Sequence, residues 1–490
     1  MVNRLGISIA LGAFAVLGYA PFYFYPATIL ALAGLFWLVD SAATPRHATW
    51  LGLAFGAGLF GVGISWLYIS LHDFGEMPML LAALATAALC GFVALFPMMT
   101  AWLATRYFPN KKLFALPLLL ALLEWVRSWI FTGFPWLTVG YSQVPYSPLA
   151  GLAPVVGVYG VSLATAACAA LIAAAVAKKI SVKKMGLWLL VFWVGGSALK
   201  HVEWSTPFGK PLTFSLLQGN ISQSLKWQKD ELPHTLQIYL DMVLASRTQL
   251  IVIPEMALPQ LAENLPNNYL GSMAQHAAAQ GGNVLIGIPE SAAKNGETVY
   301  FNSVISLGSA PSQSYQKSHL VPFGEFIPFK SLIGWIYDDV LHIPLADLER
   351  GTLQPQPMNL SGQKVALNIC YEDVFGEEII RQLPAATLLV NVSNDAWYGE
   401  SLAAEQHLQM SQTRALETAR AVLRSTNTGV SAVIDRDGRV LAQLPQFTQA
   451  ALEGQVQGYQ GVTPYVMWGN WALISFVLIG LGVLRRRKYS

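Results

Sequence analysis

Residues 365–373 read VALNICYED, and this stretch decides how the C-terminal half of the chain is interpreted. Its first five residues form an apolar, β-rich run that predicts a buried strand. Cys370 ends the run, and a turn with free backbone N–H groups follows at Tyr371, Glu372 and Asp373. A thiol at a strand end can act as a nucleophile beside an oxyanion site. The alternative is a buried structural thiol, because free cysteines are among the most often buried residues.

The strand before Cys370 is one of several in residues 205–460, which predict a soluble α/β domain. Helical stretches at 271–280 and 404–423 lie between some of these strands. Strands that read as continuous apolar runs are typical of sheets covered on one or both faces. The strand-like runs are 212–217 (LTFSLL), 250–253 (LIVI), 284–288 (VLIGI), 365–369 (VALNI) and 388–392 (LLVNV).

Outside this region the chain is strongly apolar. Of its 490 residues, 54% are hydrophobic and only 12% are charged, which argues against a cytosolic enzyme and against disorder. A membrane-spanning helix needs about 20 mainly apolar residues. The sequence therefore predicts a polytopic α-helical membrane protein with about eight transmembrane helices. The apolar runs are 5–20, 27–41, 49–71, 78–104, 113–130, 149–177, 186–200 and 466–484.

The basic residues of the short loops predict the orientation, because Lys and Arg collect on the cytoplasmic side of a membrane. Their alternation predicts cytoplasmic termini and an α/β domain on the outer side. It also predicts three parts: a seven-helix region at 1–204, the α/β domain at 205–460, and a helix with a basic tail at 461–490. The loop residues are Arg4, Arg46, Arg106, Lys111, Lys112, Lys178, Lys179, Lys183, Lys184, Arg485, Arg486, Arg487 and Lys488.

Several classes of protein are disfavoured by the composition. The net charge is +2 without a basic face, which argues against a nucleic-acid partner. The three cysteines make no disulfide framework, because Cys90 and Cys168 lie in apolar runs and Cys370 stands alone. The eight histidines have no ligand spacing and no Gly-rich phosphate loop follows a strand, so we predict neither a metal nor another cofactor.

Two further segments offer groups that could activate Cys370. Glu255 lies in PEMALP (254–259) directly after a strand, and Lys317 begins KSHLVPFGEFIP (317–328). Taken alone, such a glutamate is usually a helix cap and such a lysine a surface charge. Together with NICYED (368–373), the segments resemble the Glu-Lys-Cys constellation of the nitrilase superfamily of carbon-nitrogen hydrolases.

A nitrilase-like region between apolar segments resembles the apolipoprotein N-acyltransferase family over nearly the whole chain. The matching motifs include FPWL (134–137), GY (140–141), QGN (218–220), SNDAWYG (393–399) and RSTNTG (424–429). The resemblance implies an αββα sandwich on the periplasmic side of a bacterial inner membrane. It implies transfer of an acyl chain from a phospholipid, phosphatidylethanolamine, to the N-terminal amine of diacylglyceryl-cysteine in apolipoproteins, through a Cys370 thioester.

The resemblance also implies roles for the site residues. Glu255 would be the general base, and Lys317 would stabilise the thiolate and the oxyanion together with the backbone N–H of Tyr371. Glu325 and Glu372 would be supporting carboxylates that orient this set.

Aromatic residues predict where a lipid would bind, although an ordinary core is the alternative. The apolar stretch 322–345 follows Lys317 and would make an arm at the bilayer surface. Trp136 and Tyr141 could form the opposite wall. The predicted substrate-binding residues are Trp227, Trp136, Tyr141, Phe323, Phe326 and Trp397.

Two other functions remain open from the sequence. A membrane-anchored amidase would use the same Glu-Lys-Cys set, but one anchor would suffice for a water-soluble substrate. A transporter with an outer ligand-binding domain would need polar groups at mid-membrane, and the apolar runs carry almost none away from their ends.

Overall fold

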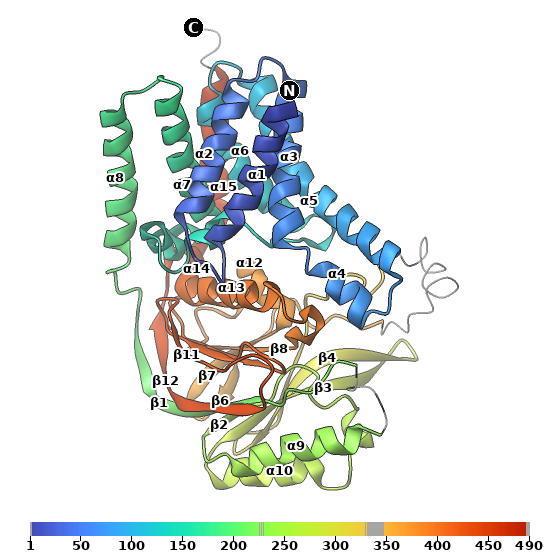
Figure 1. Ribbon diagram of the computed structural model, residues 1–490. Helices are drawn as coiled ribbons and strands as arrows, with labels where there is room; N and C mark the ends of the chain where they lie inside the picture. The colour runs from blue at the N-terminus through green and yellow to red at the C-terminus, as the bar shows by residue number, and fades with distance from the viewer. Residues whose placement is uncertain are drawn as a thin grey trace.

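The computed structural model describes residues 2–224, 226, 228, 230–328, 330 and 347–486. Figure 1 shows a helical region stacked on a domain of sheets and helices. Both described ends of the chain lie at the far end of the helical region, away from the sheets (Figure 1). Arg487 and Lys488 of the predicted basic tail lie outside the described residues.

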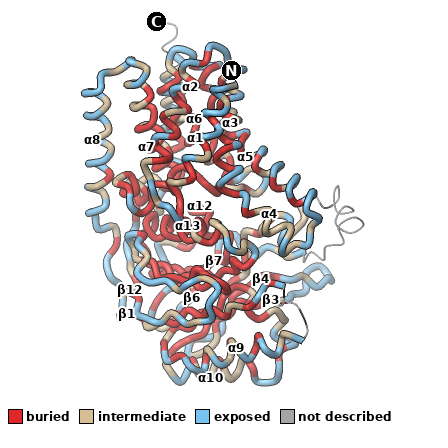
Figure 2. Tube along the Cα trace, in the orientation of Figure 1, coloured by how far each residue is buried: buried red, intermediate tan, exposed pale blue. Residues whose placement is uncertain are grey.

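The helical region contains the predicted apolar runs, each of which folds mainly as helix. α5 and α7 are the longest of these helices, and α8 is exposed along most of its length, with Gly196 as its buried residue (Figure 2). The helices are α1 Val2–Ala15, α2 Pro26–Asp40, α3 Pro45–Gly63, α4 Leu67–Ile69, α5 Met79–Tyr107, α6 Lys112–Arg127, α7 Ala153–Val176, α8 Val182–Leu199 and α15 Trp471–Arg486.

The predicted apolar run 49–71 is not one continuous helix, so that prediction is wrong in detail. α3 ends at Gly63, and the helical turns that follow it at residues 67–74 are bent by 57° from α3. The carbonyl of Gly63 is freed by this break and accepts from Gln406 Nε2 at 3.1 Å, while Trp66 Nε1 donates to Gln406 Oε1 at 3.2 Å. Polar contacts with the neighbouring domain therefore replace the helical hydrogen bonds.

By length and apolar composition, three helices in the described part of the chain could each cross a membrane. They are Met79–Tyr107, Pro148–Val176 and Val182–Leu199, and the bent pair beginning at Pro45 would make a fourth. α1 and α2 are shorter apolar helices. α15 returns to this region and packs against α6, and Lys111 Nζ donates to the Leu484 carbonyl at 2.8 Å.

Two six-stranded sheets form the other domain, in the orders β12-β1-β2-β3-β4-β5 and β11-β10-β9-β8-β7-β6. β1, β2 and β3 are parallel neighbours, as are β7, β8 and β9. The strands are β1 Ser205–Gln218, β2 Leu250–Val252, β3 Asn283–Lys294, β4 Glu297–Gly308, β5 Gln313–Gln316, β6 Met358–Leu360, β7 Gln363–Ile369, β8 Leu388–Ser393, β9 Val422–Thr426, β10 Ala432–Ile434, β11 Val440–Gln443 and β12 Ala450–Gly461.

Helices cover the outer face of each sheet, so the domain is an αββα sandwich. α9 (Leu232–Ala245) and α10 (Tyr269–Ala279) pack on the first sheet, whereas α12 (Gly376–Ile379) and α13 (Ala403–Thr418) pack on the second (Figure 1). Apolar side chains of both sheets share one core, which explains the unbroken apolar strands. All five predicted strand runs lie in observed strands, and Ile253 alone lies one residue beyond the end of β2.

The predicted helix 404–423 is wrong in its last residues. α13 ends at Thr418, Ala419 takes a left-handed backbone with φ 51°, and β9 begins at Val422. An apolar run that includes β-branched Val422 suits a buried strand as well as a helix, so periodicity could not separate the two. α13 also contacts α7, so this face of the sandwich joins the helical region (Figure 1).

Candidate active site

Cys370 lies where β7 ends and a 3₁₀ turn, Cys370–Val374, begins. Its backbone is left-handed with φ 51°, a conformation that costs a non-glycine residue about 1–2 kcal/mol. The side chain is buried, at 8% exposure. The thiol therefore stands at a strained strand end that the surrounding structure holds in place, as is common at functional sites.

Lys317 and two glutamates form a buried hydrogen-bonded group beside this strand end. Lys317 Nζ lies 3.2 Å from Glu255 Oε1 and 2.9 Å from Glu325 Oε1. Asn302 Nδ2 from β4 donates to the same two oxygens, at 2.7 and 2.9 Å. One ammonium and one amide thus fix both carboxylates. The sequence predicted the lysine and the glutamates, whereas nothing in it singled out Asn302.

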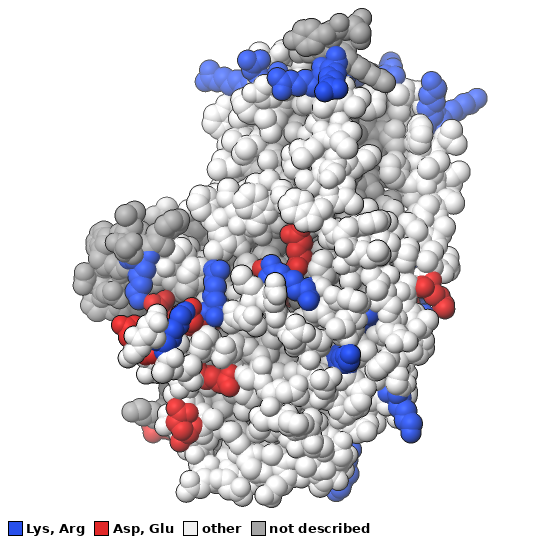
Figure 3. Space-filling view, turned by 180° about the vertical axis from the view of Figure 1, so that it is seen from behind, with Lys and Arg blue, Asp and Glu red and all other residues white. Residues whose placement is uncertain are grey.

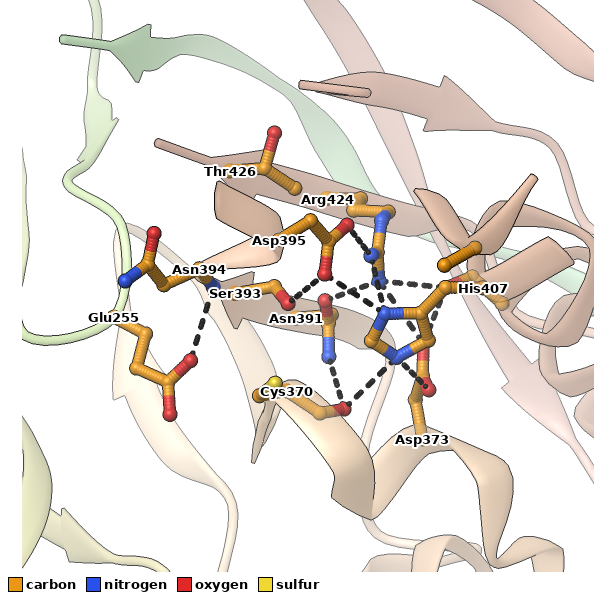
Figure 4. Close-up of polar contacts among 12 residues, drawn as sticks. Glu255, Cys370, Asp373, Asn391, Ser393, Asn394, Asp395, His407, Arg424 and Thr426 are labelled. Carbon is orange, nitrogen blue, oxygen red and sulfur yellow. Dashed lines mark hydrogen bonds and ion pairs between the residues drawn. The ribbon is translucent and has the colours of Figure 1, made fainter. Parts of the chain in front are cut away.

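The sheet topology brings Glu255 and Cys370 together, because Glu255 follows β2 and Cys370 follows β7 at the same end of the sandwich (Figure 4). Burial and the nearby Glu255 carboxylate raise the pKa of the Cys370 thiol well above its usual value, and Lys317 opposes this. Burial lowers the pKa of Lys317, but Glu255, Glu325 and Cys370 outweigh burial and raise it overall. The resting site therefore holds a neutral thiol and a charged lysine.

Glu372 ties the segment after Lys317 to the turn after Cys370. Its Oε1 accepts from the backbone and hydroxyl of Ser318 at 2.6 and 2.9 Å and from the backbone of His319 at 3.0 Å. Its Oε2 accepts from Tyr315 Oη and from the Ile369 backbone, both at 2.7 Å. Burial raises the pKa of Glu372, although these hydrogen bonds oppose the rise. Glu372 is thus placed to orient both segments.

The predicted aromatic residues lie in different environments. Trp136 and Tyr141 are 1% exposed at the junction with the helical region, where Trp136 Nε1 donates to Gln406 and Tyr141 Oη to the Val374 carbonyl. Both side chains are packed between the helical region and the sheet domain, so the wall of the lipid site that they were predicted to form is not open in this structure. Phe323 and Trp397 are exposed.

The structure describes Phe326, another residue predicted to bind the lipid, but not all of the remaining predicted lipid site. The ring of Phe326 is half-buried, and the guanidinium of Arg350 lies 5.3 Å from its centroid. Trp227 and most of the predicted arm at 322–345 lie outside the described residues.

Two more features of the site escaped sequence reasoning. Lys226 is buried, and burial lowers its pKa to about 8, although Glu255 and Cys370 act in the opposite direction. His407 lies in a buried cluster with Asp373, Asp395 and Arg424 behind Cys370 (Figure 4). A scattered histidine carries no spacing signal, and only the neighbouring motifs SNDAWYG and RSTNTG pointed to this part of the chain.

A buried thiol, a carboxylate and an ammonium at one strand end are the groups that nucleophilic catalysis by cysteine requires. A family profile described as carbon-nitrogen hydrolase matches residues 214–464, so the sheet domain belongs to that class of enzymes. A second profile, described as the apolipoprotein N-acyltransferase N-terminal domain, matches residues 11–171. The whole chain belongs to the apolipoprotein N-acyltransferase family.

Relatives with that name are similar over almost their full length. The apolipoprotein N-acyltransferase of Nitrosomonas europaea is 53% identical, and the alignment covers 98% of this chain and 96% of that protein. The apolipoprotein N-acyltransferase of Chromobacterium violaceum is 42% identical, with 96% and 91% covered. The similarity therefore includes both the helical region and the sheet domain.

Proposed function

We propose that this protein transfers a fatty acyl chain from a membrane phospholipid to the N-terminal amine of diacylglyceryl-cysteine in apolipoproteins. The observation that carries the proposal is the buried group of Cys370, Glu255, Lys317 and Glu325, in a carbon-nitrogen hydrolase domain joined to an apolar helical region. The donor is the sn-1 chain of phosphatidylethanolamine. The reaction completes the maturation of bacterial lipoproteins.

In the first half-reaction, the Cys370 sulfur attacks the ester carbonyl of the donor while Glu255 takes the thiol proton. The raised pKa of the Cys370 thiol makes this transfer necessary. Lys317 and the backbone N–H of Tyr371 stabilise the oxyanion that forms. The C–O bond then breaks, Glu255 returns its proton to the leaving oxygen, and a lysophospholipid departs.

In the second half-reaction, the neutral amine of the acceptor attacks the thioester of Cys370. Glu255 takes a proton from the amine as the C–N bond forms. The C–S bond then breaks, and the thiolate recovers a proton from Glu255. Glu325 and Glu372 orient Lys317 and the turn after Cys370 in both halves. Such a ping-pong scheme lets two bulky lipids use one site in turn.

The charge distribution supports a defined orientation in the bacterial inner membrane. The back view has basic side chains at the far end of the helical region, a broad band without charges below them, and both signs of charge around the sheets (Figure 3). We propose eight spanning helices, cytoplasmic termini and a periplasmic catalytic domain. In this arrangement residues 205–460 are inserted between the helical region 1–204 and the last helix with its tail, 461–490.

Exposed apolar side chains on the active-site side support a lipid-binding surface. Phe323 follows Lys317 closely, and Trp397 precedes a turn at Gly399 that approaches Ile69. The first turn of α5 adds Met79 and Leu80, both exposed. Such side chains are costly in water but favourable at a bilayer surface. We propose that Phe323 and Trp397 contact the donor.

The orientation predicts which positions a membrane-impermeant thiol reagent reaches from outside. A cysteine placed at Asn295, in the exposed β3–β4 turn, is expected to be labelled in intact spheroplasts, whereas one at Ser181, before α8, is expected to require lysis. The native cysteines are buried, so the wild-type protein gives the background. Labelling at Ser181 but not at Asn295 would place the catalytic domain in the cytoplasm and exclude this function.

The proposed function is tested with purified protein, phosphatidylethanolamine labelled in its sn-1 chain, and a diacylglyceryl-cysteinyl peptide. The peptide is expected to gain the labelled chain as an amide, and one lysophospholipid is expected to appear per amide. An amidase would instead hydrolyse the finished amide in the absence of donor. Release of free fatty acid without amide formation would contradict the proposal.

A further inference from the structure

A cluster of four ionisable side chains lies directly behind Cys370 (Figure 4). Asp373 follows the nucleophile in the same turn, and Asp395 begins the turn after β8. His407 lies in α13 and Arg424 in β9. All four are at most 2% exposed, so water screens none of them. Burying charges is costly, and the mechanism above uses none of these four.

The four side chains form a closed ring of contacts. Arg424 Nη1 lies 3.2 Å from Asp373 Oδ2, and Nη2 lies 2.7 Å from Asp395 Oδ2. His407 Nε2 lies 2.8 Å from Asp373 Oδ1, and Nδ1 lies 3.0 Å from Asp395 Oδ1. Ser411 also donates to Asp373. Each carboxylate therefore contacts both the guanidinium and the imidazole.

Charge balance favours a protonated histidine in this ring. Two carboxylates and one guanidinium sum to −1, and an imidazolium brings the cluster to zero. A neutral imidazole has a single N–H and could donate to only one of the two carboxylates. Arg424 Nη2 also lies 2.9 Å from His407 Nδ1, and Nδ1 could accept from it only in a neutral imidazole; in the imidazolium, Nδ1 donates to Asp395 instead.

The pKa values agree with a protonated His407. Burial and Arg424 lower the pKa of His407, but Asp373 and Asp395 outweigh them and raise it to about 9. Burial raises the pKa of Asp395, but Arg424 and His407 lower it to about 2. His407 is thus positively charged at neutral pH, and the two carboxylates balance it and Arg424.

The cluster acts on Cys370 in two ways. It contacts the backbone carbonyl of Cys370, and its charges change the pKa of the Cys370 thiol. His407 Nε2 lies 3.3 Å from the Cys370 carbonyl oxygen, to which Asn391 Nδ2 donates at 3.4 Å. These contacts fix the carbonyl of Cys370, whose own backbone is left-handed. Asp395 raises the pKa of the Cys370 thiol, and Ser393, which donates to Asp395 at 2.9 Å, lowers it. Uncompensated negative charge here would disfavour the thiolate.

We propose that His407 is a positioning residue that acts as an imidazolium, holding the Cys370 carbonyl and keeping the buried cluster behind the nucleophile neutral. The inference rests on the proposed role of Cys370 but not on the identity of the lipids. The charged or titratable groups that face His407 are Cys370 and Asp373 from the nucleophile turn, Asp395 from the turn after β8, and Arg424 from β9. The ring of Trp136 packs against the imidazole at 5.6 Å.

The test is the rate at which iodoacetamide, a small neutral reagent, alkylates Cys370 in the full-length protein without lipid substrates. Peptide mass spectrometry separates Cys370 from the other two cysteines. His407→Gln is expected to slow alkylation at pH 7 by about tenfold, because it leaves the cluster at −1. Adding Asp395→Asn to His407→Gln restores neutrality and is expected to recover part of the rate, about threefold or more.

The pH profile gives a readout that a merely structural role would not change. In the wild type, alkylation is expected to rise with pH and to flatten near pH 9, where His407 loses its proton and the cluster becomes negative. His407→Gln is expected to lose the break near pH 9 and to keep only the bend near pH 8, where Lys226, which also acts on Cys370, loses its proton. His276→Gln is the matched control, because His276 lies in α10 and bonds the carbonyl of Ser246, the residue after α9, away from the site.

Three results would overturn the inference: an unchanged rate and profile in His407→Gln, a double variant slower than His407→Gln, or a wild-type profile without a break near pH 9. The last result needs no variant, so the test stands even if His407→Gln fails to fold. Failure of the proposed function is seen separately, as an absence of acylated Cys370 in wild-type protein given phospholipid.

Discussion

Wild-type protein incubated with phosphatidylethanolamine and no acceptor is expected to gain the mass of one acyl chain on Cys370, and Cys370→Ala is expected to gain none. Without an amine the second half-reaction cannot proceed, so the thioester accumulates. Neutral hydroxylamine is expected to remove the adduct, because it cleaves thioesters. Intact-protein and peptide mass spectrometry measure both results.

Cys168→Ala is the matched control for this experiment. Cys168 is a buried free cysteine in α7, outside the catalytic domain, so its loss removes a thiol without touching the site. This variant is expected to form the adduct like the wild type. An adduct on Cys370→Ala, or turnover by wild-type protein that never carries an adduct, would show that Cys370 is not the nucleophile.

The sequence was most informative where a reactive side chain follows closely after an apolar strand. Cys370 directly follows an apolar strand, and Glu255 follows another after two residues, so parallel strands of facing sheets bring them to one end of the sandwich. Lys317 follows β5 at the sheet edge and joins them. Strand direction explains why the three side chains meet, whereas the sequence brought them together only through the resemblance to the nitrilase superfamily, because each segment taken alone is a weak signal.

Other parts of the site depend on contacts between distant segments, which a single sequence does not reveal. His407 and Asp373 are 34 residues apart and meet only because α13 packs on the sheet that carries the nucleophile. Trp136 was predicted to form a wall of the lipid site, but its indole is buried and donates to Gln406 of α13 across the domain junction. The carbonyl of Gly63, freed at the break after α3, accepts from the same glutamine. Each of these features involves hydrogen bonds between segments that lie far apart in the sequence.

Replacing Lys317 by Met or by Arg is expected to leave the protein folded but to slow acylation of Cys370 at least about a hundredfold. Lys317 Nζ lies within 3.2 Å of both Glu255 and Glu325, and it favours the thiolate. Loss of one well-placed oxyanion donor costs on the order of 100- to 1000-fold in rate. The planar guanidinium of arginine cannot take the place of a compact ammonium at such short range. Rapid-quench mass spectrometry of Cys370 measures the rate.

Lys294→Met provides the matched control, because Lys294 pairs with Glu349 at 2.9 Å on the surface. Exposed pairs contribute about 0–1 kcal/mol to stability, so this variant is expected to fold and to acylate normally. If Lys317 only held the fold, Lys317→Arg would keep most of the acylation rate and Lys317→Met would unfold the domain. Near-normal acylation by folded Lys317→Met would refute the proposed role, because Glu255 alone would then activate the thiol.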